Sequence, residues 1–427
     1  MTGFAGYGRS TFASLRTRNY RFFFVGQLFS VMGTWMQTVA QSFLVLELTH
    51  SGTTLGLTIA ARFLPIFLFG PWGGVVADRF DRRRAMYLTQ SASGIICAIL
   101  ATVVGADLVR LWMVYALALA LGFVNVFDNP VRQALISDLV PREQLSNAVM
   151  LNSVTINAAR IFGGAVGGAV AATLGLTLCF ALNALSFVIV IVTVRAMTGS
   201  EIDRPPRAPR APRQVRDGIR YVRHTPTLLL PLLMIAVIGT LAWEFPVSLP
   251  LVASATFDGG AGLYGAMIST MGAGAVAGGL VSASRKHIGT RALALSAVGW
   301  GLAITLAAVA PTLPLEFAAL VFVGYGSITF NSYGKIVMQL GSRPDMRGRV
   351  MALWALAWLG STPIGGPIVG WVGQEFGARW SLLIGGVPTL IIGLALYPIL
   401  TRLDRPDAPE PVPVAVAASE PDADRAA

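Results

Sequence analysis

Charged residues are scarce in this sequence of 427 residues. Asp, Glu, Lys and Arg make up 12% of the chain, against about 25% in soluble globular domains, and 54% of the residues are hydrophobic. The composition therefore excludes an ordinary water-soluble globule and is typical of a polytopic membrane protein. The net charge of +11 comes from short basic clusters between long apolar runs, which indicates membrane topology and no nucleic-acid partner.

Cysteine and histidine are nearly absent as well. The two cysteines, Cys97 and Cys179, each lie inside an apolar run, which excludes a disulfide framework and a Cys-based metal site. The three histidines, His50, His224 and His287, fall near the ends of such runs and offer no buried catalytic imidazole. We therefore expect no metal, no cofactor and no catalytic residues. An integral membrane enzyme such as an acyltransferase would need a cluster of His, Asp or Cys that this sequence lacks.

The apolar runs are long enough to cross a bilayer core, which takes about 20 residues of helix. Those free of charge are 22–46, 85–106, 259–284, 292–315, 350–374 and 380–401. Runs with one internal charge are 48–77, 111–131, 144–174 and 224–257, and 317–341 is interrupted by Lys335 alone. The run 161–194 is too long for one span and is expected to break near Gly175. We predict an all-α fold of twelve transmembrane helices.

The basic residues lie on one side of the predicted membrane. With the N-terminus in the cytoplasm, 26 Lys and Arg fall in inner segments and two, Arg110 and Arg379, fall outside. Because Lys and Arg concentrate in cytoplasmic loops, both termini are predicted to be cytoplasmic and the protein to lie in the inner membrane. The first span lacks a small-residue cleavage site and is longer than a signal-peptide core, so we expect it to be retained.

A long polar interruption divides six spans from six. It contains a Pro- and Arg-rich run at 205–213, which predicts an extended, solvated linker. After this run, Val215, Ile219 and Val222 have helical spacing among arginines. They predict either a short amphipathic helix on the inner membrane surface or an extension of the seventh span. The expected units are an N-terminal bundle at 1–197, the linker at 198–226, a C-terminal bundle at 227–402 and a disordered cytoplasmic tail at 403–427.

The two halves resemble each other in sequence. An offset of 202 positions aligns Gly122 with Gly324 and Asn129 with Asn331. One offset that serves several helices indicates an internal duplication, as in transporters built from repeated bundles around a site at the membrane midplane. We therefore predict a pseudo-twofold arrangement of two six-helix bundles.

The loop after the second predicted helix carries a recognisable motif. Residues 74–84 read Gly-Val-Val-Ala-Asp-Arg-Phe-Asp-Arg-Arg-Arg, which resembles the Gly-x-x-x-Asp-Arg-x-Gly-Arg-Arg motif of the major facilitator superfamily. Asp81 stands where that motif has Gly. The resemblance implies a role in conformational change for Gly74, Asp78, Arg79, Arg82 and Arg83. It also implies that Asp78 contacts the start of the eleventh helix, where helix-end amides attract negative charge.

A second motif lies on the fourth helix. Residues 127–134 read Phe-Asp-Asn-Pro-Val-Arg-Gln-Ala, and Leu-Val-Pro follows at 139–141. Together with Glu-Leu-Thr-His-Ser-Gly at 47–52, they resemble the branch of the superfamily that holds enterobactin exporters and transmembrane secretion effectors. The resemblance implies secondary active export of drugs or siderophore-like compounds by alternating access, usually in exchange for protons.

Polar residues occur in stripes on helices 1, 4, 7 and 10, which line the central cavity in the superfamily that the sequence resembles. Within hydrocarbon, such residues must face other helices or water, so the stripes mark the expected pathway. Ordinary hydrogen bonding between helices is the alternative for any one stripe. The candidate cavity-lining residues are Gln27, Thr34, Gln37, Gln41, Asn125, Asn129, Thr240 and Asn331.

Four basic residues within spans, Arg62, Arg132, Arg160 and Lys335, are candidate gate charges. Asp128 and Lys335 both approach the inner face of their helices, so a pair between them would close the inside in the outward-open state. Arg132, one helical turn from Asp128, offers a local ion pair as the alternative. A contact of Asp128 with the basic loop after helix 2 is a further alternative.

Two acids well inside spans, Glu244 and Asp128, are the candidate proton carriers. Apolar surroundings favour the protonated carboxyl, and Glu244 lies between Trp243 and Phe245 without a basic neighbour in sequence. Asp128 has a basic residue four positions on, which makes it the poorer candidate. A structural ion pair of Glu244 with Arg62 or Arg160 is the alternative to a carrier role.

The sequence thus predicts a proton-driven exporter of amphiphilic small molecules, most simply a monomer in the lipid bilayer. An importer or a flippase for lipid-linked precursors would have the same fold. A non-transporting sensor of this fold is a further alternative, and flux assays separate it from a transporter.

Overall fold

A computed structural model describes residues 13–198, 214–285 and 288–404, and in these ranges the protein has helices and no strands. The N-terminal helices are the short η1 (Ala13–Arg16), α2 (Arg18–Thr49), α3 (Gly52–Arg79), α4 (Arg82–Gly105), α5 (Leu111–Leu139), the short η2 (Arg142–Gln144), α6 (Leu145–Leu174) and α7 (Leu176–Arg195). The C-terminal helices are α8 (Gln214–Arg223), α9 (Pro226–Ala242), α10 (Phe245–Ala255), α11 (Ala261–Ser284), α12 (Thr290–Val309), α13 (Leu313–Leu340), α14 (Arg347–Leu359), α15 (Thr362–Glu375) and α16 (Ala378–Leu403).

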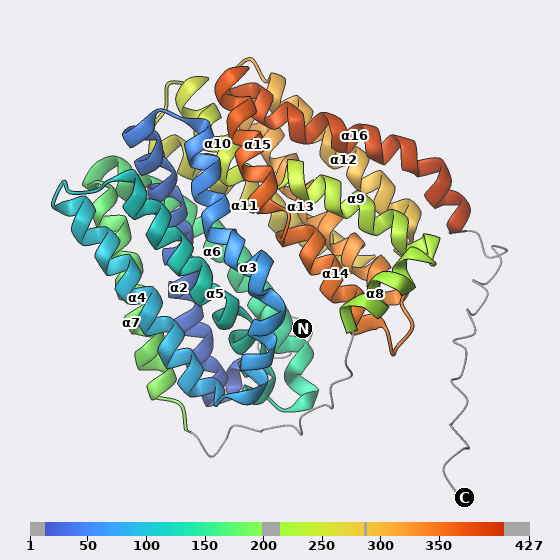
Figure 1. Ribbon diagram of the computed structural model, residues 1–427, viewed down its shortest axis with the longest axis horizontal. Coiled ribbons are helices and arrows are strands. Elements are labelled where there is room, and N and C mark those ends of the chain that lie inside the picture. The colour runs from blue at the N-terminus through green and yellow to red at the C-terminus, as the bar shows by residue number, and fades with distance from the viewer. Residues whose placement is uncertain (1–12, 199–213, 286–287, 405–427) are drawn as a thin grey trace, which may run out of the picture.

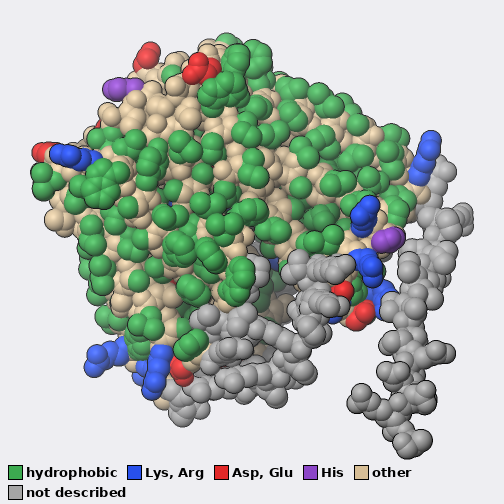
Figure 2. All heavy atoms as spheres, viewed as in Figure 1, with side chains coloured by type: hydrophobic (Ala, Val, Ile, Leu, Met, Phe, Trp, Pro, Cys, Tyr) green, Lys and Arg blue, Asp and Glu red, His purple; other side chains and the backbone are tan. Residues whose placement is uncertain are grey.

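Eleven helical segments in these described ranges are long and apolar enough to cross a membrane, which confirms the predicted fold class. The pairs α9–α10 and α14–α15 each form one such segment. Helix α2 has 32 residues but is absent from the eleven, because its polar side chains lower the hydropathy of its sequence. The count of twelve therefore holds only when α2 is included. Hydrophobic side chains cover the face in Figure 2, and charged ones gather at its edges.

Short breaks separate the spans where the sequence indicates. Helix α6 ends at Leu174 and α7 begins at Leu176, and Gly175 between them has φ 90°. This left-handed backbone conformation favours glycine, so the expected break of the run 161–194 is confirmed. The seventh span bends as well: α9 ends at Ala242, and α10 begins at Phe245. Glu244 therefore lies at a break between two helices and not inside a continuous one.

The spans form two groups, α2–α7 and α9–α16, which are close together at the top of Figure 1 and diverge toward the bottom. At the close end, a Cβ added to Gly265 on α11 would lie 2.5 Å from the carbonyl oxygen of Gly164 on α6. On the other side, Gly56 of α3 lies directly against Gly366 of α15. Glycine at these positions lets the two groups of helices touch backbone to backbone.

Helix α8 is a separate helix and not an extension of the seventh span, because Pro226 begins α9 after a break. It packs against the C-terminal group at the divergent end. Its Asp217 carboxylate lies 3.6 Å from the Arg349 guanidinium, and its Tyr221 hydroxyl accepts a 3.2 Å hydrogen bond from the Arg343 amide. The linker residues 199–213 and the tail from 405 lie outside the described residues, so the predicted domain boundaries stay predictions.

Candidate functional site

A buried carboxylate on α5 anchors a polar cluster inside the N-terminal bundle. Asp128 is 2% exposed and forms an ion pair with Arg132, one turn further along the same helix. Thr89 Oγ1 and Gln90 Nε2 on α4 each donate a 2.7 Å hydrogen bond to Asp128 Oδ1. The local ion pair is thus formed in this structure, and the two α4 side chains, which were not among the predicted site residues, complete the hydrogen bonding of the carboxylate.

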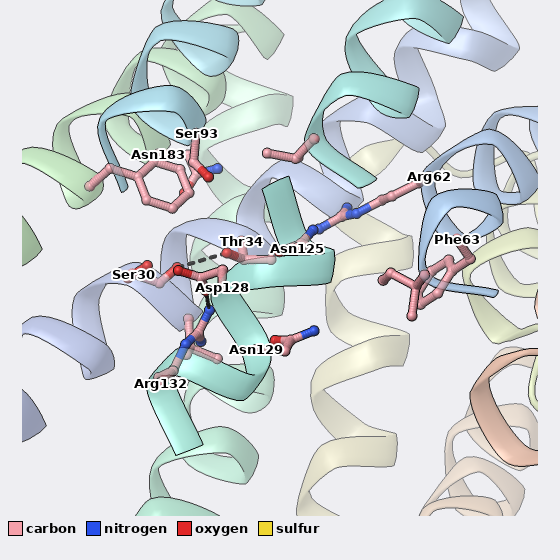
Figure 3. A pocket seen from close by; sticks show the side chains of 14 residues that line it. Ser30, Thr34, Arg62, Phe63, Ser93, Asn125, Asp128, Asn129, Arg132 and Asn183 are labelled. Atoms are coloured by element: carbon pink, nitrogen blue, oxygen red, sulfur yellow. Dashed lines mark hydrogen bonds and ion pairs between the residues drawn. The ribbon is translucent and has the colours of Figure 1, made fainter. Parts of the chain in front are cut away.

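This cluster borders a pocket of about 200 Å³ between α2, α3, α4, α5 and α7 (Figure 3). Of the predicted residues, the pocket brings together Thr34, Arg62, Asn125, Asp128, Asn129 and Arg132. Ser30, Ser93, Asn183 and several apolar side chains complete its wall. The charged groups on this wall are two cations and one carboxylate, so the pocket carries an excess of positive charge.

Other members of the predicted polar stripes lie elsewhere. Gln37 faces the interior of the bundle, where Asn183 Nδ2 donates to its Oε1 and Cys97 Sγ lies 3.0 Å from the same atom. Gln37 Nε2 in turn donates to Gln41 Oε1 at 3.3 Å. Gln27 is buried, and neither its Oε1 nor its Nε2 has a hydrogen-bond partner. Hydrogen bonding between helices therefore accounts for Gln37.

The C-terminal candidates do not line this pocket. Thr240 Oγ1 donates to the backbone oxygen of Ala236 at 2.7 Å, a bond within its own helix. Asn331 is half-buried on α13, and Lys335, one turn further on, is exposed. Asp128 makes its described ion pair with Arg132 and not with Lys335. The cross-bundle gate is expected in the outward-open state, so it stays a prediction.

The carboxyl of Glu244 lies at the junction of α9 and α10 and is 2% exposed. It packs against glycines of α15: a Cβ on Gly365 would lie 3.2 Å from Glu244 Oε1, and one on Gly366 would lie 3.5 Å from Oε2. Its Oε1 has no hydrogen-bond partner among the described residues. Because Gly365 and Gly366 have no side chains, α15 leaves room for this buried carboxyl.

The predicted ion pair of Glu244 with an arginine is not formed among the described residues. Arg62 points from α3 into the polar pocket (Figure 3). The guanidinium of Arg160 lies over two indole rings instead, with its Cζ 4.9 Å from the ring centre of Trp35 and 5.9 Å from that of Trp243. Arg160 therefore contacts the residue next to Glu244 but not its carboxylate.

The loop between α3 and α4 explains the departure from the superfamily motif at position 81. Asp81 is the N-cap of α4, and its side chain accepts a 2.9 Å hydrogen bond from the Arg84 amide. Arg82 forms an ion pair with the buried Asp138 of α5, and Arg83 donates a 2.9 Å hydrogen bond to the backbone oxygen of Arg195. The structure describes neither the surroundings of Gly74 nor the side chains of Asp78 and Arg79.

Two buried acids were not among the site residues predicted from the sequence. Asp138, near the end of α5, is 3% exposed and partners Arg82. Glu316, in the first turn of α13, is 1% exposed and has Arg379 of α16 as its charged neighbour. The signal available for Glu316 was that Arg379 is one of only two basic residues predicted on the outer side.

The sequence profile of the transmembrane secretion effector family matches residues 9–421. The chain belongs to this family. Its members are transporters of the major facilitator superfamily, so the resemblance noted on the fourth helix is confirmed, and this family member is a multi-pass membrane transporter.

Curated relatives of this transmembrane secretion effector are similar over nearly the full length. The staphyloferrin A transporter of Staphylococcus aureus is 23% identical over 90% of this chain and 96% of its own. The enterobactin exporter EntS of Shigella flexneri is 26% identical over 90% of this chain and 92% of its own.

Solved structures share the fold at low sequence identity. A bacterial homologue of the human lysosomal transporter Spinster, in an inward-facing and occupied conformation, has a TM-score of 0.71 and 15% identity over 91% of this chain and 97% of its own. A POT family transporter in complex with 5-aminolevulinic acid has a TM-score of 0.74 and 11% identity over the same shares of the two chains. These likenesses place the fold of this effector among known transporters.

Proposed function

We propose that this transmembrane secretion effector exports siderophore-like amphiphilic small molecules from the cytoplasm by alternating access, in exchange for protons. The relatives named for enterobactin export and staphyloferrin A transport support the substrate class. The observation that carries the proposal is the arrangement of two helix groups that touch backbone to backbone at one end and diverge at the other (Figure 1). A transporter that alternates needs a seal of this kind that forms at one end at a time.

The orientation of the protein decides which end is sealed. With 26 basic residues on the predicted inner side and two on the outer side, both termini are cytoplasmic. Helix α3 then begins at the outer face, so the glycine contacts at Gly56 and Gly265 close the outside. We infer that the structure is the inward-open state, in which a compound enters from the cytoplasm.

Glu244 is our candidate for the proton carrier. A carrier must be reachable in both states, and its charge must be able to change within the bundle. The carboxyl is buried at a helix break and has no arginine partner among the described side chains, which favours a carrier over a fixed structural pair. Asp128, with an ion pair and two hydrogen bonds, has less freedom to change its charge.

The test is transport in everted membrane vesicles that contain the full chain. With a proton gradient, acid inside, a panel of siderophores, dyes and antibiotics is offered outside. We expect accumulation of at least one siderophore-like compound, and its loss when the gradient is collapsed. Accumulation that survives collapse of the gradient removes proton coupling, and transport in the reverse direction alone makes the protein an importer.

A further inference from the structure

Arg160 of α6 is a buried cation without an anion. It is 7% exposed, and its Nε and Nη1 have no hydrogen-bond partner. None of the ion pairs within residues 13–198, 214–285 and 288–404 includes it. Two other buried charges, Asp128 and Asp138, differ from it in that each has an arginine partner.

The contacts that Arg160 does make leave its strongest bonding capacity unused. Its guanidinium lies over the rings of Trp35 and Trp243, which attract the cation through their π faces. The N–H groups of a guanidinium point outward in its plane, toward carboxylate-like partners, and ring faces below or above that plane do not satisfy them. Burying a charge of this kind is costly in a membrane protein, so a buried charge within a span marks a candidate functional site.

Arg160 also lies where the two bundles meet. Trp35 belongs to α2 of the N-terminal group, and Trp243 follows α9 of the C-terminal group, directly before Glu244. The conformational change that separates the bundles must therefore rebuild the surroundings of this cation. A group bound by Arg160 would take part in that change.

An aromatic surface adjoins this cation on the C-terminal side. The ring of Trp358 on α14 lies 4.7 Å from that of Trp243, and Trp354 stacks on Trp358 with an interplanar angle of 4°. Trp354 and Trp243 are both only half-buried. Flat apolar surfaces of this kind suit a ring-bearing ligand.

We propose that Arg160 binds the negatively charged group of the transported compound, and that the indole of Trp243, which contacts this cation, holds its apolar, ring-bearing body. The inference rests on the proposed function and narrows its substrate class to organic anions with an aromatic part. It is an alternative to the gate role that the sequence suggested for Arg160, which stays a prediction.

The experiment measures binding to the purified full chain in detergent by titration calorimetry. The probes are 2-naphthoate and its uncharged analogue 2-naphthamide, which share one ring system. We expect naphthoate to bind at least about tenfold more tightly than naphthamide, because only the carboxylate can form an ion pair and accept hydrogen bonds from the Arg160 guanidinium. In Arg160→Gln, the affinity for naphthoate should fall to that for naphthamide. Arg160→Lys should keep part of the preference for naphthoate. The control Arg110→Gln, in an exposed loop, should keep the whole preference.

Several results would overturn the inference. One is equal binding of the two probes, and another is no binding of naphthoate to the wild-type chain. A third is an Arg160→Gln protein that still prefers naphthoate. A fourth is an Arg160→Gln protein in which the affinities for naphthoate and naphthamide fall equally, as expected if Arg160 has only a structural role. If Arg160→Gln fails to fold by size-exclusion chromatography, the wild-type pair of affinities and Arg160→Lys decide. Proton-driven export without a preference for anions overturns this inference alone and leaves the proposed function standing.

Discussion

Gly56 on α3 lies so close to Gly366 on α15 that a methyl group added to Gly56 would overlap the Gly366 carbonyl oxygen. A Cβ on Gly366 would likewise lie 3.0 Å from the carbonyl oxygen of Gly56. The two backbones therefore form one side of the sealed end without any side chain between them. On the other side, Gly164 and Gly265 make the equivalent contact between α6 and α11.

A small side chain at Gly56 should open this seal. We expect Gly56→Ala to shift the protein away from the state described here, because backbone atoms cannot move aside as a flexible side chain does. In a chain with a cysteine at the pocket residue 125, alkylation by an impermeant maleimide from the cytoplasmic side should slow severalfold. Gly70→Ala on the same helix is the matched control, since nothing lies within 4 Å of its Cβ position. Equal slowing in both variants would contradict the seal.

Removing the charge of Glu244 should separate coupling from binding. We expect Glu244→Gln to lose efflux driven by a proton gradient while it keeps substrate exchange across vesicles without a gradient. Glu375→Gln, an exposed acid at the end of α15, is the control and should behave as wild type. Gradient-driven efflux at the wild-type rate in Glu244→Gln would move the search for the carrier to Asp128.

Removing Arg132 should destabilise the protein more than removing both members of its pair. Arg132→Gln leaves Asp128 buried with Thr89 and Gln90 as its only described partners, which costs on the order of 3 kcal/mol. Thermal unfolding in detergent measures the loss. The double variant Arg132→Gln with Asp128→Asn should recover part of it, because no uncompensated charge remains. A double variant less stable than Arg132→Gln would argue against a buried pair.

The cross-bundle contact of Asp128 with Lys335 can be tested by crosslinking. Cysteines at positions 128 and 335 should crosslink when the protein is trapped outward-open, and not in the state described here, in which Lys335 is exposed. The test needs a background without Cys97 and Cys179, both of which are buried. Failure to crosslink in every trapped state would remove the gate, and the local pair of Asp128 with Arg132 would stand alone.

Asp81 should stabilise the start of α4 through its cap. We expect Asp81→Ala to cost about 1 kcal/mol, because the Arg84 amide loses its side-chain acceptor. Asp81→Asn keeps an acceptor and should cost far less. Thermal unfolding of the two variants side by side measures the difference, and equal melting temperatures would show that the cap is not what selects Asp at this position.

The sequence by itself determined the fold class and the positions of most spans. A long apolar run that crosses a bilayer forms a helix, because all its backbone polar groups must be hydrogen-bonded within the segment. The break at Gly175 was predictable for a local reason, since a glycine can take the positive φ that ends α6. The motifs on the second and fourth helices pointed to the family because each motif is contained in a short segment of the sequence.

The tertiary structure alone decided how the polar residues pair. Helical spacing places Gln37 and Thr34 on one stripe, yet Gln37 bonds to Asn183 inside the bundle, and Thr34 borders the pocket. It also decided that Arg160 lies over Trp35 and Trp243 and not beside the carboxylate of Glu244. The physical reason is that spacing along one helix fixes a direction around its axis, while the partner in that direction is set by the packing of helices distant in sequence.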